Sequence, residues 1–156
     1  MPRSAETHAE LRLARFLPYR LSVLSNRISQ DISALYSARF GLSVTEWRVM
    51  AVLGHEPGVS ANRLVERTAM DKVAVSRAVS ALLDKKFLLR RVDAGDRRRS
   101  SLKLSAKGYA VFDQVVPLAL ALERRILSAL EPAEQSQLLA ILDKLEAAEL
   151  ALGPHP

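Results

Sequence analysis

Arginine and lysine are the side chains with the most definite chemistry in this sequence, and they are concentrated in one block. Residues 60–107 contain 13 Lys and Arg against 5 Asp and Glu, a net charge of +8, although the whole 156-residue chain carries only +6. A basic block of this kind favours an anionic partner such as nucleic acid, and a solvated charged loop is the alternative. The densest part, 90–107, contains Arg90, Arg91, Arg97, Arg98, Arg99, Lys103 and Lys107.

Side chains suited to catalysis or metal binding form no recognisable pattern in the sequence. There is no Gly-rich phosphate loop, no nucleophile elbow and no His/Asp/Glu set at ligand spacing. The chain has no cysteine, which removes thiol catalysis, disulfides and Cys-based metal sites. We therefore expect a protein that is not an enzyme and that holds neither a metal nor another cofactor. No apolar run approaches membrane length and no signal-peptide core is present, so the expected compartment is the cytoplasm.

Apolar periodicity and turn residues predict the elements that carry the basic block. Four helices are expected over 18–36, 45–54, 60–67 and 71–86, with Thr45 and Ser60 as N-caps of the second and third. Two short strands, 88–92 and 100–104, flank the turn 93–96 and form a β-hairpin. Ser105 caps a helix that runs to about 129, with a kink or break expected at Pro117. A last helix covers 132–150.

This order predicts a mainly α fold with a small β-hairpin wing: a winged helix-turn-helix flanked by terminal helices. We expect an N-terminal extension over 1–17, dimerisation helices over 18–40 and 106–150, a winged helix-turn-helix that binds DNA over 41–105, and a C-terminal tail over 151–156. The terminal helices carry apolar stripes, one from Leu17 to Leu35 and one from Leu138 to Leu145, that are too large to leave in water. A symmetric homodimer would bury them, and packing of the two ends within one chain is the alternative.

The helix over 71–86 is suited to the major groove of duplex DNA, because the first residues of such a helix reach base edges. Lys72, Ser76 and Arg77 lie on or near one face, and Val73 can touch a thymine methyl group. Arginines of the hairpin have the length to enter the adjacent minor groove. RNA is disfavoured, because 88–107 has no aromatic residue on which bases could stack. The candidate DNA-binding residues are Ser60, Lys72, Val73, Ser76, Arg77, Arg90, Asp96, Arg97, Arg98 and Arg99.

Several of these residues also have purely structural interpretations. Arg77 can pair with Asp84 or another neighbour, Ser76 can be a small residue at a helix crossing, and Arg98 can belong to a disordered tip. Asp96 can brace Arg98 through a local ion pair. At the level of the whole chain, two alternatives remain: a ligand-independent DNA-binding regulator or activator, and a winged helix used as a protein-interaction module.

Four segments of the sequence resemble the MarR family of bacterial winged-helix regulators: 45–50, 70–79, 93–98 and 102–108. The most specific part is Asp-x-Arg at Asp96 and Arg98, followed by a short strand and a Leu-Ser-x-x-Gly helix start. The resemblance covers roughly 18–150 and implies a triangular dimer built from terminal helices, with one winged helix-turn-helix per subunit. It also implies binding to palindromic duplex DNA, repression of nearby genes, and relief by a small, often aromatic and acidic, molecule. Its recognition helix falls on 71–86, with Ser76 and Arg77 as the DNA-facing pair.

The same resemblance implies an effector pocket between the dimer helices and the DNA-binding part. An aromatic wall with an arginine and small hydroxyl groups suits a planar carboxylate, which a guanidinium can hold with two hydrogen bonds. Alternatively, Trp47 is a core residue, the serines permit close helix approach, and His55 is a helix cap. Lack of cysteine excludes the thiol-oxidation branch of the family, and scattered histidines argue against its zinc-sensing branch. The candidate effector-binding residues are Tyr19, Arg20, Ser22, Asn26, Trp47, Arg48 and His55.

Overall fold

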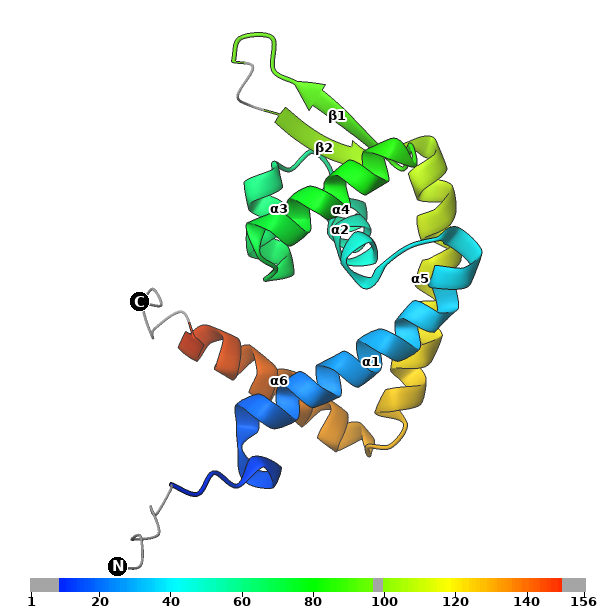
Figure 1. Ribbon diagram of the computed structural model, residues 1–156. Helices are drawn as coiled ribbons and strands as arrows, with labels where there is room; N and C mark the ends of the chain where they lie inside the picture. Colours follow the sequence, from blue (N-terminus) through cyan, green and yellow to red (C-terminus); the bar gives the residue numbers. More distant parts are fainter. Residues whose placement is uncertain (1–8, 97–99, 150–156) are drawn as a thin grey trace, which may run out of the picture. The chain divides into compact units, whose positions relative to one another are not determined.

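The computed structural model describes residues 9–96 and 100–149 and confirms a mainly α fold with a two-stranded antiparallel hairpin (Figure 1). Within these residues no helix is both long enough and apolar enough to cross a lipid bilayer. In chain order the elements are η1 (Leu13–Arg15), α1 (Leu17–Phe40), α2 (Val44–His55), α3 (Ala61–Thr68), α4 (Lys72–Asp84), β1 (Leu88–Val92), β2 (Ser100–Leu104), α5 (Ala106–Leu127) and α6 (Pro132–Glu149).

Helix boundaries follow the capping residues more closely than the apolar pattern. Helix α2 is capped by Ser43 rather than by the expected Thr45, because Ser43 and Glu46 form a reciprocal capping box that Thr45 cannot form. Ser60 caps α3 as expected, and the Asp71 carboxylate accepts the Ala74 N–H at the start of α4. Helix α1 runs four residues past its predicted end, to Phe40, and its C-cap Gly41 has a φ of 62°, the left-handed conformation that ends many helices.

The chain divides into two compact units between Val115 and Val116, inside α5. Of the kink or break expected at Pro117, the break does not occur: α5 continues through this residue to Leu127. A proline removes one helical hydrogen bond, and the leucine- and alanine-rich run that follows is a strong helix former. The first unit contains α1 to α4, the hairpin and the start of α5. The second contains the rest of α5 and all of α6.

A single apolar core holds the first unit together. Helix α4 contributes Val75, Ala78, Val79 and Leu82, which recur at the three- and four-residue spacing of one helical face. The same core takes residues from α1, α2, α3, the hairpin, α5 and the connections before α2 and β1, all less than a tenth exposed: Tyr36, Leu42, Val49, Met50, Leu53, Leu64, Phe87, Leu88, Leu102, Leu104, Val111 and Val115. Because one face of α4 is fully occupied by the core, its opposite face is fixed toward solvent.

Pairing and capping hold the hairpin against the helices. Strands β1 and β2 pair in register from Leu88 opposite Leu104 to Val92 opposite Ser100. On the other side of β2, Leu102 exchanges backbone hydrogen bonds of 2.9 Å with the segment 58–59 that leads into α3. Ser105 caps α5 as predicted, and a Cβ at position 108 would overlap the carbonyl oxygen of Phe87, so the glycine is required there. The Leu-Ser-x-x-Gly segment therefore joins α5 closely to the end of the α4–β1 turn.

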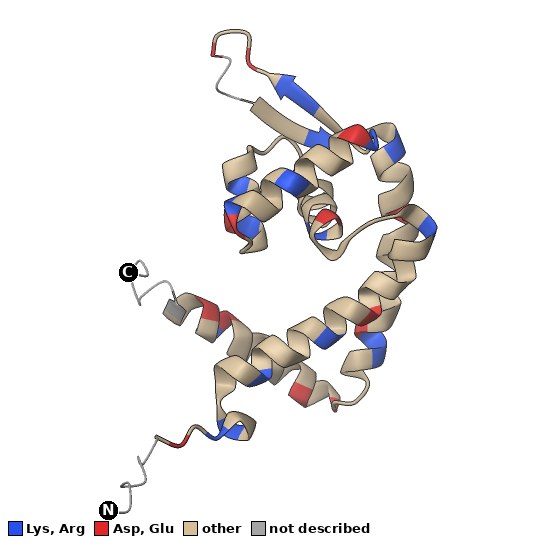
Figure 2. Cartoon of the chain, in the orientation of Figure 1, with Lys and Arg blue, Asp and Glu red and all other residues tan. Residues whose placement is uncertain are grey.

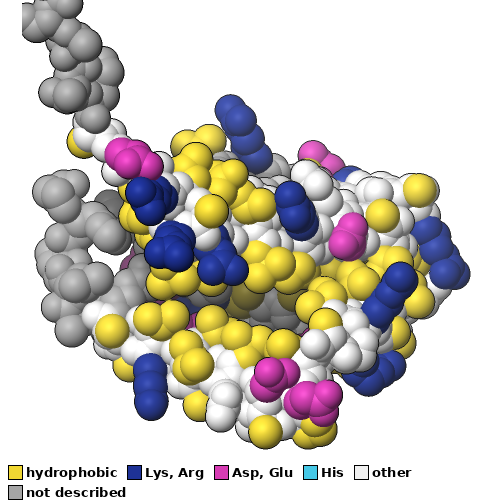
Figure 3. Space-filling view, turned by 90° about the horizontal axis from the view of Figure 1, so that it is seen from below, with side chains coloured by type: hydrophobic (Ala, Val, Ile, Leu, Met, Phe, Trp, Pro, Cys, Tyr) yellow, Lys and Arg dark blue, Asp and Glu magenta, His cyan; other side chains and the backbone are white. Residues whose placement is uncertain are grey.

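Many apolar side chains of the terminal helices are exposed. Figure 3, which views the molecule from below Figure 1, shows hydrophobic side chains spread widely over this face. In α1 the exposed residues include Leu17, Leu21 and Leu24. In α6 every side chain that the structure describes is exposed except the half-buried Gln135. Its exposed large apolar residues are Leu138, Leu139, Ile141, Leu142 and Leu145.

The carboxylate of Glu56, just after α2, anchors α3. It accepts hydrogen bonds of 2.8 and 2.9 Å from Arg67 and lies 3.5 Å from the guanidinium of Arg63. The hydrogen bonds from Arg67, helped by the arginine charges, lower the pKa of Glu56 from 4.5 to about 2. Since the pKa is lower in the folded chain, the pair stabilises the fold above about pH 4.5 and loses this contribution as the pH falls toward 2.

We expect Glu56→Gln to lower the melting temperature slightly at neutral pH, because exposed ion pairs are weak. The difference in melting temperature between parent and variant should close as the pH falls from about 4.5 toward about 2, where the parent carboxylate is protonated as well. Circular dichroism melts across this range measure it. Glu66→Gln, which removes an exposed ion pair with Arg63 but leaves the hydrogen bonds between Arg67 and Glu56 in place, is the control. A difference that does not change with pH would contradict this assignment.

Candidate nucleic-acid interface

The solvent face of α4 presents the residues that the sequence singled out for duplex DNA. Lys72, Val73, Ser76 and Arg77 are all exposed. Val73 is apolar, yet it lies on the solvent face of α4 and is 58% exposed. The N-cap Asp71 satisfies the Ala74 N–H at 2.9 Å. Helix α4 therefore begins at a well-defined point and carries an exposed cationic face with one apolar contact surface.

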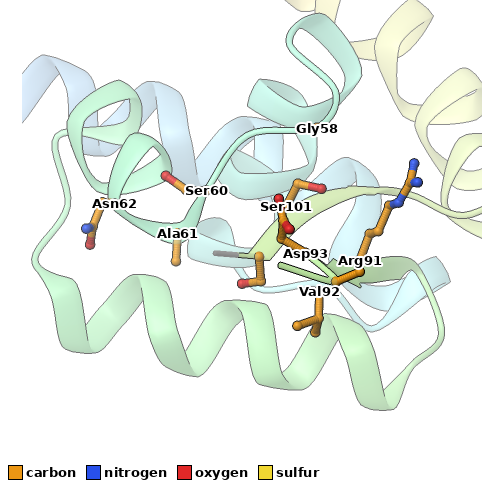
Figure 4. A pocket seen from close by; sticks show the side chains of 10 residues that line it. Gly58, Ser60, Ala61, Asn62, Arg91, Val92, Asp93 and Ser101 are labelled. Atoms are coloured by element: carbon orange, nitrogen blue, oxygen red, sulfur yellow. The ribbon is translucent and has the colours of Figure 1, made fainter. Parts of the chain in front are cut away.

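Two hollows lie between α3 and the hairpin, and the smaller one also borders α4. A small one of about 110 Å³ lies where α3, α4 and β1 meet, and it brings together Lys72, Ser76 and Arg90 with Asn62. A larger one of about 900 Å³ lies between the start of α3 and the hairpin (Figure 4). Figure 4 shows Ser60 and Asn62 on the α3 side and Arg91 with its strand neighbours on the other. The larger hollow is lined by Gly58, Ser60, Ala61, Asn62, Arg91, Val92, Asp93, Ala94, Ser100 and Ser101.

Asn62 and Arg91 are interface candidates that the sequence analysis did not select. Successive side chains of a strand point to opposite faces, so the neighbours Arg90 and Arg91 line different hollows. This alternation was readable from the strand prediction and places the two arginines on opposite faces of the hairpin. Asn62 carries no comparable sequence signal. It lies two residues after the N-cap Ser60, and it borders the smaller hollow only because α3 packs against α4.

Some cations of this surface form ion pairs with carboxylates, and others do not. Arg63 and Arg67 of α3 are paired with Glu56 and Glu66. Within the described part of the chain, Lys72, Arg77 and Arg90 form no ion pair. The alternative that pairs Arg77 with Asp84 is therefore not realised. Figure 2 shows Lys and Arg on α3, α4 and both strands, and those of α3 are the ones paired with carboxylates.

Comparison with known proteins identifies the family. Residues 40–99 match the family model described as MarR family. The HTH-type transcriptional regulator BilQ of Clostridium symbiosum (strain WAL-14163) is 30% identical over 105 residues, which are 67% of this chain and 73% of BilQ. This chain belongs to the MarR family. It is a DNA-binding transcriptional regulator of the MarR type.

Solved structures agree with this assignment. A MarR/EmrR family transcriptional regulator from Acinetobacter sp. ADP1 has a TM-score of 0.81 and 28% identity, and the match covers 88% of this chain and 97% of that one. Bordetella bronchiseptica BpsR, described as regulated in its DNA binding by 6-hydroxynicotinic acid, has a TM-score of 0.76 and 22% identity, and the match covers 88% of this chain and 98% of BpsR. At 22% identity the likeness to BpsR shows the shared fold alone.

The wing of this MarR-type regulator is described only in part. Arg97, Arg98 and Arg99 lie outside the described residues, so the predicted ion pair between Asp96 and Arg98 stays a prediction. Before them, the Asp93 carboxylate accepts the Gly95 N–H at 2.7 Å and forms the turn that follows β1. The turn residues Asp93 to Asp96 are exposed. The three arginines therefore occupy the connection between an exposed turn and β2.

The effector candidates are only partly brought together. Trp47 is half-buried and packs between Tyr36 and Phe112, with ring centroids 5.6 and 5.9 Å apart. The guanidinium of Arg48 donates a 3.1 Å hydrogen bond to the Ser29 hydroxyl of α1, and burial raises the pKa of Tyr36 while Arg48 opposes the rise. Arg48 therefore interacts with two α1 residues that were absent from the candidate set: with Ser29 through a hydrogen bond and with Tyr36 through its charge. The remaining candidates are exposed on α1 or at the end of α2: Tyr19, Arg20, Ser22, Asn26 and His55.

Proposed function

We propose that this MarR-family regulator is a homodimeric repressor that reads a two-fold symmetric duplex site through α4 and the wing, and that a small aromatic carboxylate releases it. The observation that carries the DNA-reading role is the exposed face of α4, where Lys72 and Arg77 have no carboxylate partner in the described chain. Arg90 extends this cationic surface from β1. Because its target would be chromosomal DNA, we place the protein in the cytoplasm, on the nucleoid when bound.

Each contact residue has a role that follows from its side chain. Arg77 is suited to a guanine edge or a phosphate, Lys72 and Arg90 to phosphates, and Val73 to a thymine methyl group. Ser60 and Asn62 at the start of α3 can donate hydrogen bonds to phosphate oxygens of the DNA backbone. Residues 41–105 form the DNA-binding part, and 18–40 with 106–150 form the dimerisation part.

A homodimer is proposed because the terminal helices expose more apolar surface than a monomer tolerates. We expect sedimentation at micromolar concentration to give the mass of two chains. Leu139→Glu, at an exposed position of α6, should shift the protein toward monomer or unfold it. Gln137→Glu makes the same change in charge at an exposed polar position and should leave the dimer intact. A well-folded parent monomer at this concentration would contradict the dimer.

An aromatic carboxylate is proposed as the effector because consecutive residues of α2, Trp47 and Arg48, supply an aromatic ring and a guanidinium. The guanidinium also donates a hydrogen bond to the Ser29 hydroxyl of α1. Such a ligand can lower DNA affinity only by as much as its affinities for the free and DNA-bound conformations differ. Titrating a panel of aromatic acids should identify one that raises the melting temperature and releases the duplex. Arg48→Ala and Arg20→Ala should weaken its binding. If no acid has either effect, the ligand class is wrong. If one does but neither variant weakens its binding, the site lies elsewhere.

A further inference from the structure

Lys85, the residue at which α4 ends, joins that helix to the turn between α1 and α2. Its ammonium group donates to the Gly41 carbonyl oxygen at 2.7 Å and to the Glu46 carboxylate at 2.5 Å. Gly41 is the C-cap of α1, where the helix dipole favours a positive charge. One side chain therefore connects the end of the DNA-reading helix to the end of α1 and to the first turn of α2.

Among the residues that the structure describes, Glu46 is the one charged residue that is buried, with 9% exposure. Its carboxylate closes the capping box of α2 by accepting the Ser43 N–H, and it also accepts from Lys85. A carboxylate with so little water around it depends on its partners, because an ion left alone in such a place is strongly disfavoured. Although the Lys85 side chain is 32% exposed, loss of this contact would leave the nearly buried Glu46 carboxylate without its ion-pair partner.

The α4–β1 turn is held from a second side by α5. The Ser105 hydroxyl donates to the Lys86 carbonyl at 2.7 Å, and the Lys107 ammonium donates to the Lys85 carbonyl at 3.1 Å. Lys86 itself has a φ of 60°, a conformation that residues other than glycine adopt only when the surroundings impose it. The C-terminal end of α4 is thus clamped, whereas its first residues, from Lys72, face solvent.

We propose that Lys85 and Glu46 are positioning residues for DNA binding, which set the direction of α4 without touching DNA. Helix α4 has 13 residues and is about 20 Å long, so a tilt of about 5° at its clamped end moves its first turn by about 2 Å. A shift of that size is enough to misalign a hydrogen bond to a base edge. The inference rests on the proposed role of α4 as the DNA-reading helix.

Glu46→Gln tests the proposal through the sign of its effect. The variant raises the positive charge of each subunit by one, so electrostatics alone would leave DNA binding equal or tighter. Glutamine can still serve in a capping box, but it loses the ion pair with Lys85. We expect affinity to fall roughly 3- to 30-fold, the range of couplings transmitted through a structure. Asp84→Asn, an exposed neighbour with the same change in charge, should bind as well as the parent or better.

The assay uses the full-length dimer and a labelled duplex that the parent protein recovers from a random library, far below each variant's melting temperature. Lys85→Met should weaken binding to a similar degree with an unchanged slope of log K against log salt, because no phosphate contact is lost. Lys85→Arg should restore much of the affinity. The double variant Lys85→Met, Glu46→Gln should bind no worse than the weaker single variant. If Lys85→Met does not fold, Glu46→Gln against Asp84→Asn decides the question.

Two results would overturn the role of the pair. One is equal binding by Glu46→Gln and Asp84→Asn. The other is a salt slope that falls by about one per subunit in Lys85→Met, which would make Lys85 a direct phosphate contact. Arg77→Ala is included in the same series. If Arg77→Ala binds like the parent, the proposed interface on α4 fails and takes the positioning role with it. If Arg77→Ala is weakened and Glu46→Gln is not, only the positioning role fails.

Discussion

Replacing Arg98 with alanine should weaken binding of the dimer to its duplex site by about 2–6 kcal/mol, from about 1–3 kcal/mol in each of two subunits. Arg98 lies in the connection between β1 and β2, next to the exposed turn that ends at Asp96. If α4 enters the major groove as we propose, a guanidinium at this position can reach the adjacent minor groove, where the electrostatic potential is most negative. The melting temperature should not change, because the core of the first unit is formed by other residues.

Fluorescence anisotropy with a labelled duplex and a parallel thermal melt separate the two possible roles of Arg98. Arg98→Lys keeps the charge but loses the planar fork, so it should bind between the parent and the alanine variant. Arg124→Ala removes the same charge from an exposed position of α5 and should bind like the parent. If Arg98→Ala binds like the parent but melts at a far lower temperature, Arg98 is structural and the wing does not contact DNA.

The affinity of the dimer for its duplex should fall about a thousandfold between about 50 and 200 mM salt. Each phosphate contact releases condensed counterions, so several contacts per subunit give a slope of log K against log salt of about −5 or steeper. We expect described residues such as Lys72, Arg77 and Arg90 to contribute to this slope, because none of the three has a carboxylate partner in the described part of the chain. Anisotropy titrations at four or more salt concentrations measure it.

The residues named for these contacts make separate contributions to that slope. Lys72→Ala should lower its magnitude by about one per subunit. Arg63→Ala removes a cation that is already paired with Glu56 and Glu66, so it should change the slope much less. A flat salt response of the parent protein would count against DNA as the partner and favour a winged helix that binds protein.

Much of the fold could be predicted from the sequence because the spacing of apolar residues and the capping residues determine each element locally. The three- and four-residue spacing of Val75, Val79 and Leu82 fixed the buried face of α4, and hence the exposed face that carries Arg77. Ser60 was recognisable as a cap from its position alone. Thr45 was the wrong cap because a pattern of single residues does not show that Ser43 and Glu46 satisfy each other. Of the kink or break expected at Pro117, the break was wrong because the helix-forming strength of the residues around it was given too little weight.

The rest depended on contacts between distant parts of the chain. Lys85 and Glu46 are 39 residues apart in sequence, and each looks like an ordinary surface charge until the elements pack. Asn62 joins Lys72, Ser76 and Arg90 only where α3, α4 and β1 meet. Likewise Trp47 was selected for an effector wall, but its packing against Tyr36 and Phe112 is set by helices α1 and α5. The periodicity of apolar residues within one element contains no information about contacts between elements.

Selection of bound sequences from a random duplex library tests the central proposal most directly. Two copies of α4 related by a dimer axis would enter successive major grooves, so the enriched sequences should contain two inverted half-sites about one helical turn apart, roughly 10 base pairs centre to centre. Footprinting of an enriched duplex should protect both half-sites together, and Arg77→Ala should lose the enrichment. Failure to enrich any sequence, or enrichment of a single half-site without symmetry, would contradict a dimeric regulator that reads DNA through α4.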